Sequence, residues 1–231
     1  MLKQSVIVAG CVSVAIASVG WSLKSGIDHF VERDRVVTVK GLSERVVPAD
    51  SVIWPIVFRL TGNDLVDVKK RADAQTDLIR AYLISQGIRE DAISLGRPSV
   101  TDTHMDFYGS NRPPERYRME CTVVVASDQV EPVLQALANQ TELIGRGVVL
   151  SQSYNTQFQF TGLNAIKPAM IEEATQNART GAQKFADDSG SRLGKIRRAS
   201  QGQFSVTDRD HNTPHLKKVR IVTTVEYYLK D

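Results

Sequence analysis

Acidic and histidine side chains gather in two polar segments of the sequence, and these are the residues best suited to chemistry. In the first segment Asp102, His104 and Asp106 alternate, so a continued strand would point all three side chains to one side. Carboxylates and imidazoles are common metal ligands. The second segment holds a comparable set, namely Asp208, Asp210, His211 and His215. One hypothesis is a metal or small-ligand site that uses both segments, and the simpler one is a pair of polar hairpin tips.

Cysteine chemistry is restricted to one thiol in the part of the chain that follows the N-terminal segment. Cys121 alternates with apolar residues in a strand-like run, which predicts a buried and unreactive side chain. An oxidant-detoxifying enzyme would have to use this thiol, and we rank that hypothesis last. The sequence contains no nucleophile elbow, zinc-protease motif, cysteine pair of the C-x-x-C type or P-loop. We therefore expect a non-enzymatic protein and assign no catalytic, cofactor-binding or metal-binding residues.

Basic side chains are concentrated in the C-terminal hairpin, where they are Arg192, Lys195, Arg197, Arg198, Arg209, Lys217, Lys218 and Arg220. Such a patch suits anionic lipid headgroups or an acidic partner, although solvated strand positions explain it equally well. The whole chain carries a net charge of only +3. Aromatic residues are too sparse in this region for a platform on which bases stack. We expect no nucleic-acid partner.

An uncharged run over residues 5–23 dominates the N-terminus. A helix of this length spans about 28 Å, close to the thickness of a bilayer core, and Lys3 before it favours a cytoplasmic N-terminus. We favour a retained signal-anchor helix. A cleaved signal peptide ending at Ala15-Ile16-Ala17 and a lipoprotein signal at residues 8–11 (VAGC) are alternatives. All three place residues 30–231 outside the cytoplasm. The expected location is a single-pass inner-membrane protein with a periplasmic C-terminal domain, or a soluble periplasmic protein after cleavage.

A short segment that occurs twice indicates an internal repeat. Residues 58–63 (FRLTGN) reappear as residues 158–163 (FQFTGL), and each copy ends a strand-like run and begins a helix-like run. A second repeated sequence follows each helix-like run, at residues 100–102 (VTD) and 206–208 (VTD). A repeat of this kind defines the folding unit but not the function.

The hydrophobic patterns predict an α+β fold made of two β-α-β-β-like halves. The expected strands are residues 36–40, 51–61, 93–103, 116–127, 148–160, 196–207 and 216–229, and the expected helices end at Gly87, near Asn139 and at Gly190. Pro55 has no donor, so its strand must lie at an edge or carry a bulge. We divide the chain into an anchor (1–23), a linker (24–34) and an ectodomain (35–231) with repeats at about 51–127 and 147–229. Antiparallel sheets packed by the long helices complete the prediction.

Several strings resemble a known family. Residues 37–45 (VTVKGLSER) are similar to the opening of SIMPL-domain proteins, whose first strand has a V-x-V-x-G pattern followed by a polar turn. Residues 160–168 (FTGLNAIKP), 188–194 (DSGSRLG) and 222–227 (VTTVEY) resemble a membrane-anchored bacterial branch of that family. The resemblance covers residues 35–229 and identifies the chain as a YggE-like bacterial envelope protein.

The resemblance implies little about chemistry. The family includes the oxidative stress defence protein YggE and a periplasmic immunogenic protein that forms a large ring-like oligomer, and it has no established catalytic residues. We therefore expect a membrane-anchored, non-enzymatic homo-oligomer in the envelope, with an oxidative-stress-related role and an unidentified protein partner. Unpaired sheet edges or helix faces would mediate the self-association.

Overall fold

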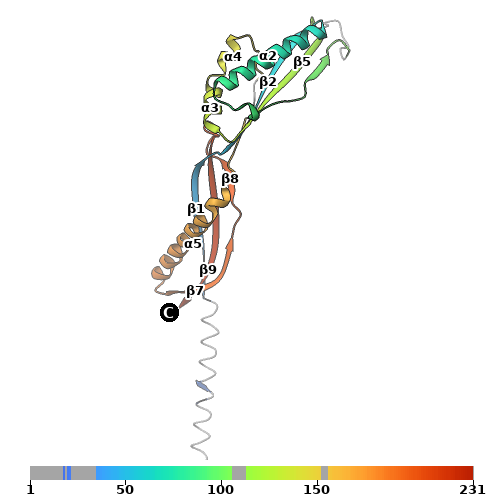
Figure 1. The fold of residues 1–231 in the computed structure, drawn as a ribbon. Coiled ribbons are helices and arrows are strands. Elements are labelled where there is room, and N and C mark those ends of the chain that lie inside the picture. The colour runs from blue at the N-terminus through green and yellow to red at the C-terminus, as the bar shows by residue number, and fades with distance from the viewer. Residues whose placement is uncertain (1–17, 19, 22–34, 106–112, 152–155, 231) are drawn as a thin grey trace, which may run out of the picture. The chain divides into compact units, whose positions relative to one another are not determined.

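The computed structural model describes residues 35–105, 113–151 and 156–230, together with Ser18, Gly20 and Trp21 (Figure 1). The predicted α+β class with antiparallel sheets is confirmed. The described residues form two compact units. Unit 1 contains the described residues within 1–45, 166–205 and 219–231, and unit 2 contains those within 46–165 and 206–218.

Unit 2 contains a five-stranded sheet covered by helices. Its strands are β2 (Ser51–Gly62), β3 (Ile93–Leu95), β4 (Ser99–Asp102), β5 (Tyr117–Ser127) and β6 (Gln157–Gln159), in the order β3-β5-β2-β6 with β4 also on β5. The helices are α2 (Leu65–Ser85), the 3₁₀ turn η1 (Glu90–Ala92), α3 (Val130–Ala138) and α4 (Thr141–Gly145). The sequence pattern predicted α2 and α3 but not α4.

The core of unit 2 follows from the alternation in β2. Trp54, Ile56 and Phe58 lie on one face of this strand and are at most 2% exposed. Asp64 begins α2 as predicted, because its carboxylate accepts the backbone N–H groups of Val66 and Asp67. Gly87 follows the helix with φ of 85°, a conformation that glycine adopts without strain. Local signals therefore position α2 over the sheet.

Pro55 lies where the outer edge of β2 has a gap. This edge pairs with β6 over Ser51–Ile53 and again through a single bridge from Phe58 to Leu150. Pro55 falls between the two paired stretches, while β5 pairs with the whole opposite edge of β2. β2 lies between β5 and β6 and its register with β5 is unbroken, so the prediction of an edge strand or a bulge is wrong. A proline is tolerated at this position because the pairing with β6 ends before it.

A second sheet contains β1 (Val36–Pro48), β7 (Arg192–Gln201), β8 (Ser205–Asp208) and β9 (Leu216–Lys230). The order is β1-β9-β7, with β8 also paired to β9. The helix α5 (Leu163–Asp188) covers one face of this sheet within unit 1 (Figure 1). It begins at Leu163, before Pro168, so the prediction that Pro168 lies in its first turn is wrong.

The long strand expected at residues 148–160 is also wrong. Within the described part of this segment, only Gln157–Gln159 form a strand, and this strand pairs with β2. The position beside β9 belongs instead to β1. Its ends are fixed by bonds from Leu229 N to Arg35 O and from Ala49 N to His215 O, each 2.8 Å, so β1 and β9 are antiparallel. The C-terminal helix and strands thus take their edge strand from the start of the chain.

The contact between α5 and β1 is unusually close. Ala174, Ala178, Ala182 and Ala186 form a fully buried stripe on α5. Below them lies Gly41, and a Cβ atom placed there would be 1.8 Å from the carbonyl oxygen of Ala174. The helix can approach the strand because small residues stand on both sides. The V-x-V-x-G pattern of residues 37–41 therefore has a packing explanation.

One apolar residue of α5 departs from its expected place. The sequence pattern assigned Phe185 to the buried stripe, but its side chain is 62% exposed and Ala186 is buried instead. The buried residues keep a spacing of four from Met170 to Ala186, and neighbouring residues on a helix are about 100° apart, so Phe185 points to one side of Ala186. Phe185 consequently lies beside the stripe rather than within it.

The start of α5 is capped by Asp50, which lies between β1 and β2. Asp50 accepts bonds from Thr161 N at 2.7 and 2.9 Å and from Gly162 N at 2.8 Å. Partial burial raises the pKa of Asp50, but these backbone bonds outweigh it and lower the pKa. The two copies of the repeated Thr-Gly segment therefore differ, since α2 is capped locally by Asp64 and α5 by a residue 111 positions away.

The N-terminal predictions fall outside the described residues. Ser18, Gly20 and Trp21 are helical, while the rest of the expected anchor (1–23) and the linker (24–34) is not described. Within the described part of the chain, no helix has the length and apolarity needed to cross a membrane. The anchor therefore stays a prediction.

Replacing Gly41 by alanine should destabilise the protein by about 3 kcal/mol, because the new methyl group overlaps the backbone of α5. Urea unfolding of the full chain, followed by circular dichroism, measures this change. Gly145→Ala is the matched control, since no atom lies within 4 Å of its added Cβ. Equal stability of the two variants would show that α5 does not approach β1 as described.

Asp50→Ala should reduce stability by about 1 kcal/mol at pH 7, a typical value for a lost cap. Folding lowers the pKa of Asp50 below its ordinary value of 3.8, so the stability that Asp50 contributes is present above that pH and is lost as the pH falls through the folded pKa. The difference between variant and wild type should therefore shrink below about pH 3.8 in acid titrations of stability. Asp77→Ala, an exposed position on α2, is the control; a loss for Asp50→Ala that does not depend on pH would contradict the cap.

Candidate functional site

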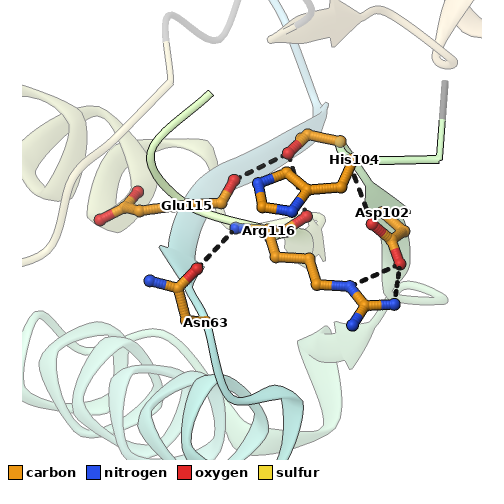
Figure 2. Close-up of polar contacts among 6 residues, drawn as sticks. Asn63, Asp102, His104, Glu115 and Arg116 are labelled. Atoms are coloured by element: carbon orange, nitrogen blue, oxygen red, sulfur yellow. Dashed lines mark hydrogen bonds and ion pairs between the residues drawn. The ribbon is translucent and has the colours of Figure 1, made fainter. Parts of the chain in front are cut away.

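The first acidic segment lies at the end of the β4–β5 hairpin, where the carboxylate of Asp102 forms an ion pair with Arg116. Arg116 donates to Asp102 Oδ2 from Nε at 2.9 Å and from Nη2 at 2.8 Å (Figure 2). The backbone N–H of His104 binds the other oxygen at 3.1 Å. The hydrogen bond from Arg116 lowers the pKa of Asp102. This carboxylate is charged and already saturated with donors from its own chain.

The remaining polar groups of this hairpin are also engaged (Figure 2). His104 Nε2 lies 2.9 Å from Pro113 O, and the Thr103 hydroxyl donates to Glu115 O at 2.7 Å. Asn63, just past β2, accepts the backbone N–H of Arg116 at 3.0 Å. Asp106, the third residue of the predicted cluster, lies outside the described residues. The arrangement closes a hairpin and leaves few ligand atoms available.

The second acidic segment, between β8 and β9, has the same character. Asp208 pairs with Lys217, whose side chain is 9% exposed. Asp210 accepts the Thr213 hydroxyl, the Arg209 Nε at 2.9 Å and the backbone N–H groups of Asn212 and Thr213. The hydroxyl bond first, and the arginine second, lower the pKa of Asp210. These carboxylates stabilise a turn.

The two histidines of this segment do not join the carboxylates in one cluster. His211 is exposed. His215 packs edge-on against Phe158, with ring centroids 6.1 Å apart, and its carbonyl accepts the N–H of Ala49. No group of three or more potential metal ligands occurs among the described residues.

The two tips lie at opposite ends of β2. The first is tied to Asn63, just past Gly62, and the second to Ala49, just before Ser51. Eleven residue steps of about 3.3 Å separate these ends by roughly 36 Å. The hypothesis of one site shared by both tips is therefore not supported by the geometry.

Cys121 is placed as the sequence predicted. It lies on β5 opposite Phe58, is 9% exposed and forms no disulfide. Burial raises the pKa of its thiol, so little thiolate forms at neutral pH. Thiol-based peroxide chemistry requires the opposite environment.

The basic residues of the C-terminal hairpin are mostly solvated. Arg192, Lys195, Arg197 and Arg198 lie on β7, where they are all exposed, and Arg197 pairs with Glu226 at 3.2 Å. Lys217 is the exception because it is buried against Asp208. These positions match those of an edge strand protected by charge.

A cavity of about 440 Å³ in unit 2 was not anticipated from the sequence. Its lining combines apolar and polar side chains, and the residues are Trp54, Ile56, Val57, Leu137, Gln140, Thr141, Ile144, Leu150, Ser151 and Thr156. They come from β2, α3, α4 and the segment after α4. No motif could reveal it, because these segments meet only in the folded unit.

A known protein family matches most of the chain, including most of β1. Residues 37–223 match the SIMPL family, described as a protein of unknown function (DUF541). The chain belongs to the SIMPL family. No curated protein matches the sequence at a significant level. The match begins in β1 and ends in β9, so the SIMPL domain includes both units, while the membrane-anchored branch stays a prediction.

Cys121 should react with a thiol reagent at pH 8 at least about a hundredfold more slowly in the native protein than in urea, because burial suppresses both access and ionisation. Rates measured with a chromogenic disulfide check this, with Cys11→Ser used throughout so that Cys121 is the only thiol. Equal rates in the two conditions would reopen the hypothesis of a thiol-dependent enzyme.

Proposed function

We propose that this SIMPL protein is a non-enzymatic, self-associating component of the bacterial envelope. It would be held in the inner membrane by residues 1–23, with the SIMPL domain in the periplasm and a role in envelope integrity or oxidative stress. The apolar run supports the location, and the family resemblance supports the role. The saturated carboxylates and the buried thiol offer no support for catalysis.

The observation that carries self-association is the pair of uncovered strands at the margins of the second sheet. Among the described strands, β1 and β7 each pair with β9 alone. An edge strand presents unpaired N–H and C=O groups that another chain can extend. Proteins that remain monomeric usually protect such edges.

The two edges differ in how well they are protected. β7 carries four basic residues and two register shifts, between Leu193 and Ile196 and between Ile196 and Arg198. Charge and irregularity both discourage pairing. β1 is longer, at 13 residues, and keeps alternating exposed and buried positions over Val39–Glu44. Of the two, β1 is better suited to receive another strand.

Small-ligand binding is the second candidate function, and the cavity of unit 2 favours it over the hairpin tips proposed from the sequence. A lining of mostly apolar side chains with a few polar ones is typical of small-molecule sites. A protein that is monomeric at all concentrations would favour this alternative.

The full chain should be recovered from the membrane fraction with its N-terminal residues intact, and in mild detergent it should have a protein mass of at least two copies. N-terminal sequencing and light scattering after size exclusion, at high micromolar concentration, measure the two properties. A processed N-terminus would overturn the anchor alone. A single-copy mass at every concentration would overturn self-association.

A further inference from the structure

We propose that unit 1 forms a two-fold symmetric dimer in which β1 pairs antiparallel with β1 of a second copy, centred on Leu42. The inference rests on the self-association proposed above and names the surface and the register through which it occurs. The interface would consist of the β1 edge, the charged side chains on it and the adjacent side of α5.

On the side away from β9, no other described strand pairs with the backbone of β1. The bonds of Arg35 and Ala49 to β9 show that odd-numbered residues direct their N–H and C=O groups toward that strand. Even-numbered residues from Val36 to Glu44 therefore direct theirs outward. The side-chain amide of Asn177 donates to Leu42 O at 2.8 Å, as expected for an outward carbonyl that lacks a strand partner.

The charges on β1 are self-complementary about Leu42. Lys40 and Glu44 lie two residues to either side of it on the same face, and both are exposed. A two-fold axis at Leu42 places Lys40 opposite Glu44 of the second copy, and Glu44 opposite Lys40, in one step. Opposite charges that face each other across strands stabilise antiparallel pairing. Centring the axis on Lys40 or on Glu44 would instead oppose like charges.

Leu42 itself has the character of a residue at the centre of such an interface. Its side chain is 42% exposed on the sheet face opposite α5. In the dimer it meets Leu42 of the second copy, with Cα atoms about 5.5 Å apart in a hydrogen-bonded pair. The N–H of the second Leu42 would then replace the Asn177 amide at Leu42 O. Both side chains would lose water-exposed apolar surface.

The position of α5 is compatible with this pairing. Val39 of β1 packs with Ala178 and Ala182 of α5 and with Val225 and Tyr227 of β9, so the helix lies over the two strands together. In a continuous sheet the two copies of α5 would then be about two strand spacings apart, roughly 10 Å. Helices pack at 8–10 Å, so the two would touch without a gap.

Phe185 is explained by the same arrangement. Glu173 and Asn177 contact β1, so they mark the side of α5 nearest the edge, and Phe185 follows Asn177 by two steps of four residues. It is 62% exposed in one copy. With the axis near Asn177, Phe185 would face Ala169 of the antiparallel helix, which is exposed and small enough to accept a ring.

Disulfide trapping tests the register. In a Cys11→Ser background, Leu42→Cys should give a disulfide-linked dimer of the full chain under mild oxidation. Val46→Cys is the control, because it lies on the same face of the same strand, is more exposed at 51% and would be about 26 Å from its own mate. Trapping at both positions, or at neither while the protein is oligomeric, would overturn the β1 interface.

Charge exchange tests the pairing between copies. Lys40→Glu and Glu44→Lys should each weaken association at least about tenfold, and an equimolar mixture should restore it, because the mixed dimer contains two opposite-charge pairs. Mixing is essential, since Glu44 also makes a contact within its own copy. Lys70→Glu, an exposed position on α2, is the charge-matched control.

Different outcomes would overturn the β1 interface and the proposed self-association. Restoration by mixing supports the interface, and association that is unchanged in Lys40→Glu or not restored by mixing overturns it. A wild-type protein that is monomeric throughout overturns the proposed self-association itself. Thermal unfolding of each variant shows whether the fold survives the charge change.

Discussion

The close approach of α5 to β1 is the constraint on which unit 1 depends. There is no room for a side chain at Gly41 beneath Ala174. The buried alanine stripe of α5 presents only small side chains to the strand, so the helix can approach it closely. The contact joins residues 133 positions apart and closes a sheet whose other strands come from the end of the chain. Since small side chains bury little surface, close packing over the whole stripe has to supply the stability.

The most polar hairpins of the described chain use their carboxylates in contacts within the hairpin itself. Asp102 and Asp210 resemble ligands in the sequence, but in the fold each is held by donors of its own hairpin. Such carboxylates organise turns, and a metal ion would have to displace Arg116 or the Thr213 hydroxyl before it could bind. Among the described strands, β1 and β7 each have one edge that no other strand pairs with, and β1 is the more regular of the two.

Local signals in the sequence predicted much of this fold. Asp64 and Gly87 delimit α2 through hydrogen bonding and backbone conformation, and the alternation around Trp54 identified the buried face of β2. Non-local choices could not be predicted in the same way. The repeat suggested a long strand over residues 148–160, yet only Gln157–Gln159 form a strand in its described part and β1 lies beside β9, because strand pairing depends on what is adjacent in space. Arg116 as the partner of Asp102 depends likewise on hairpin register.

Residue-resolved hydrogen exchange tests the placement of β1 most directly. The account predicts slow exchange at the amides of Val37, Val39, Gly41 and Ser43, which bond to β9 in the core of unit 1, with protection approaching that of global unfolding. Exchange at these four amides as fast as in an unstructured peptide, with strong protection across residues 148–160 instead, would contradict it.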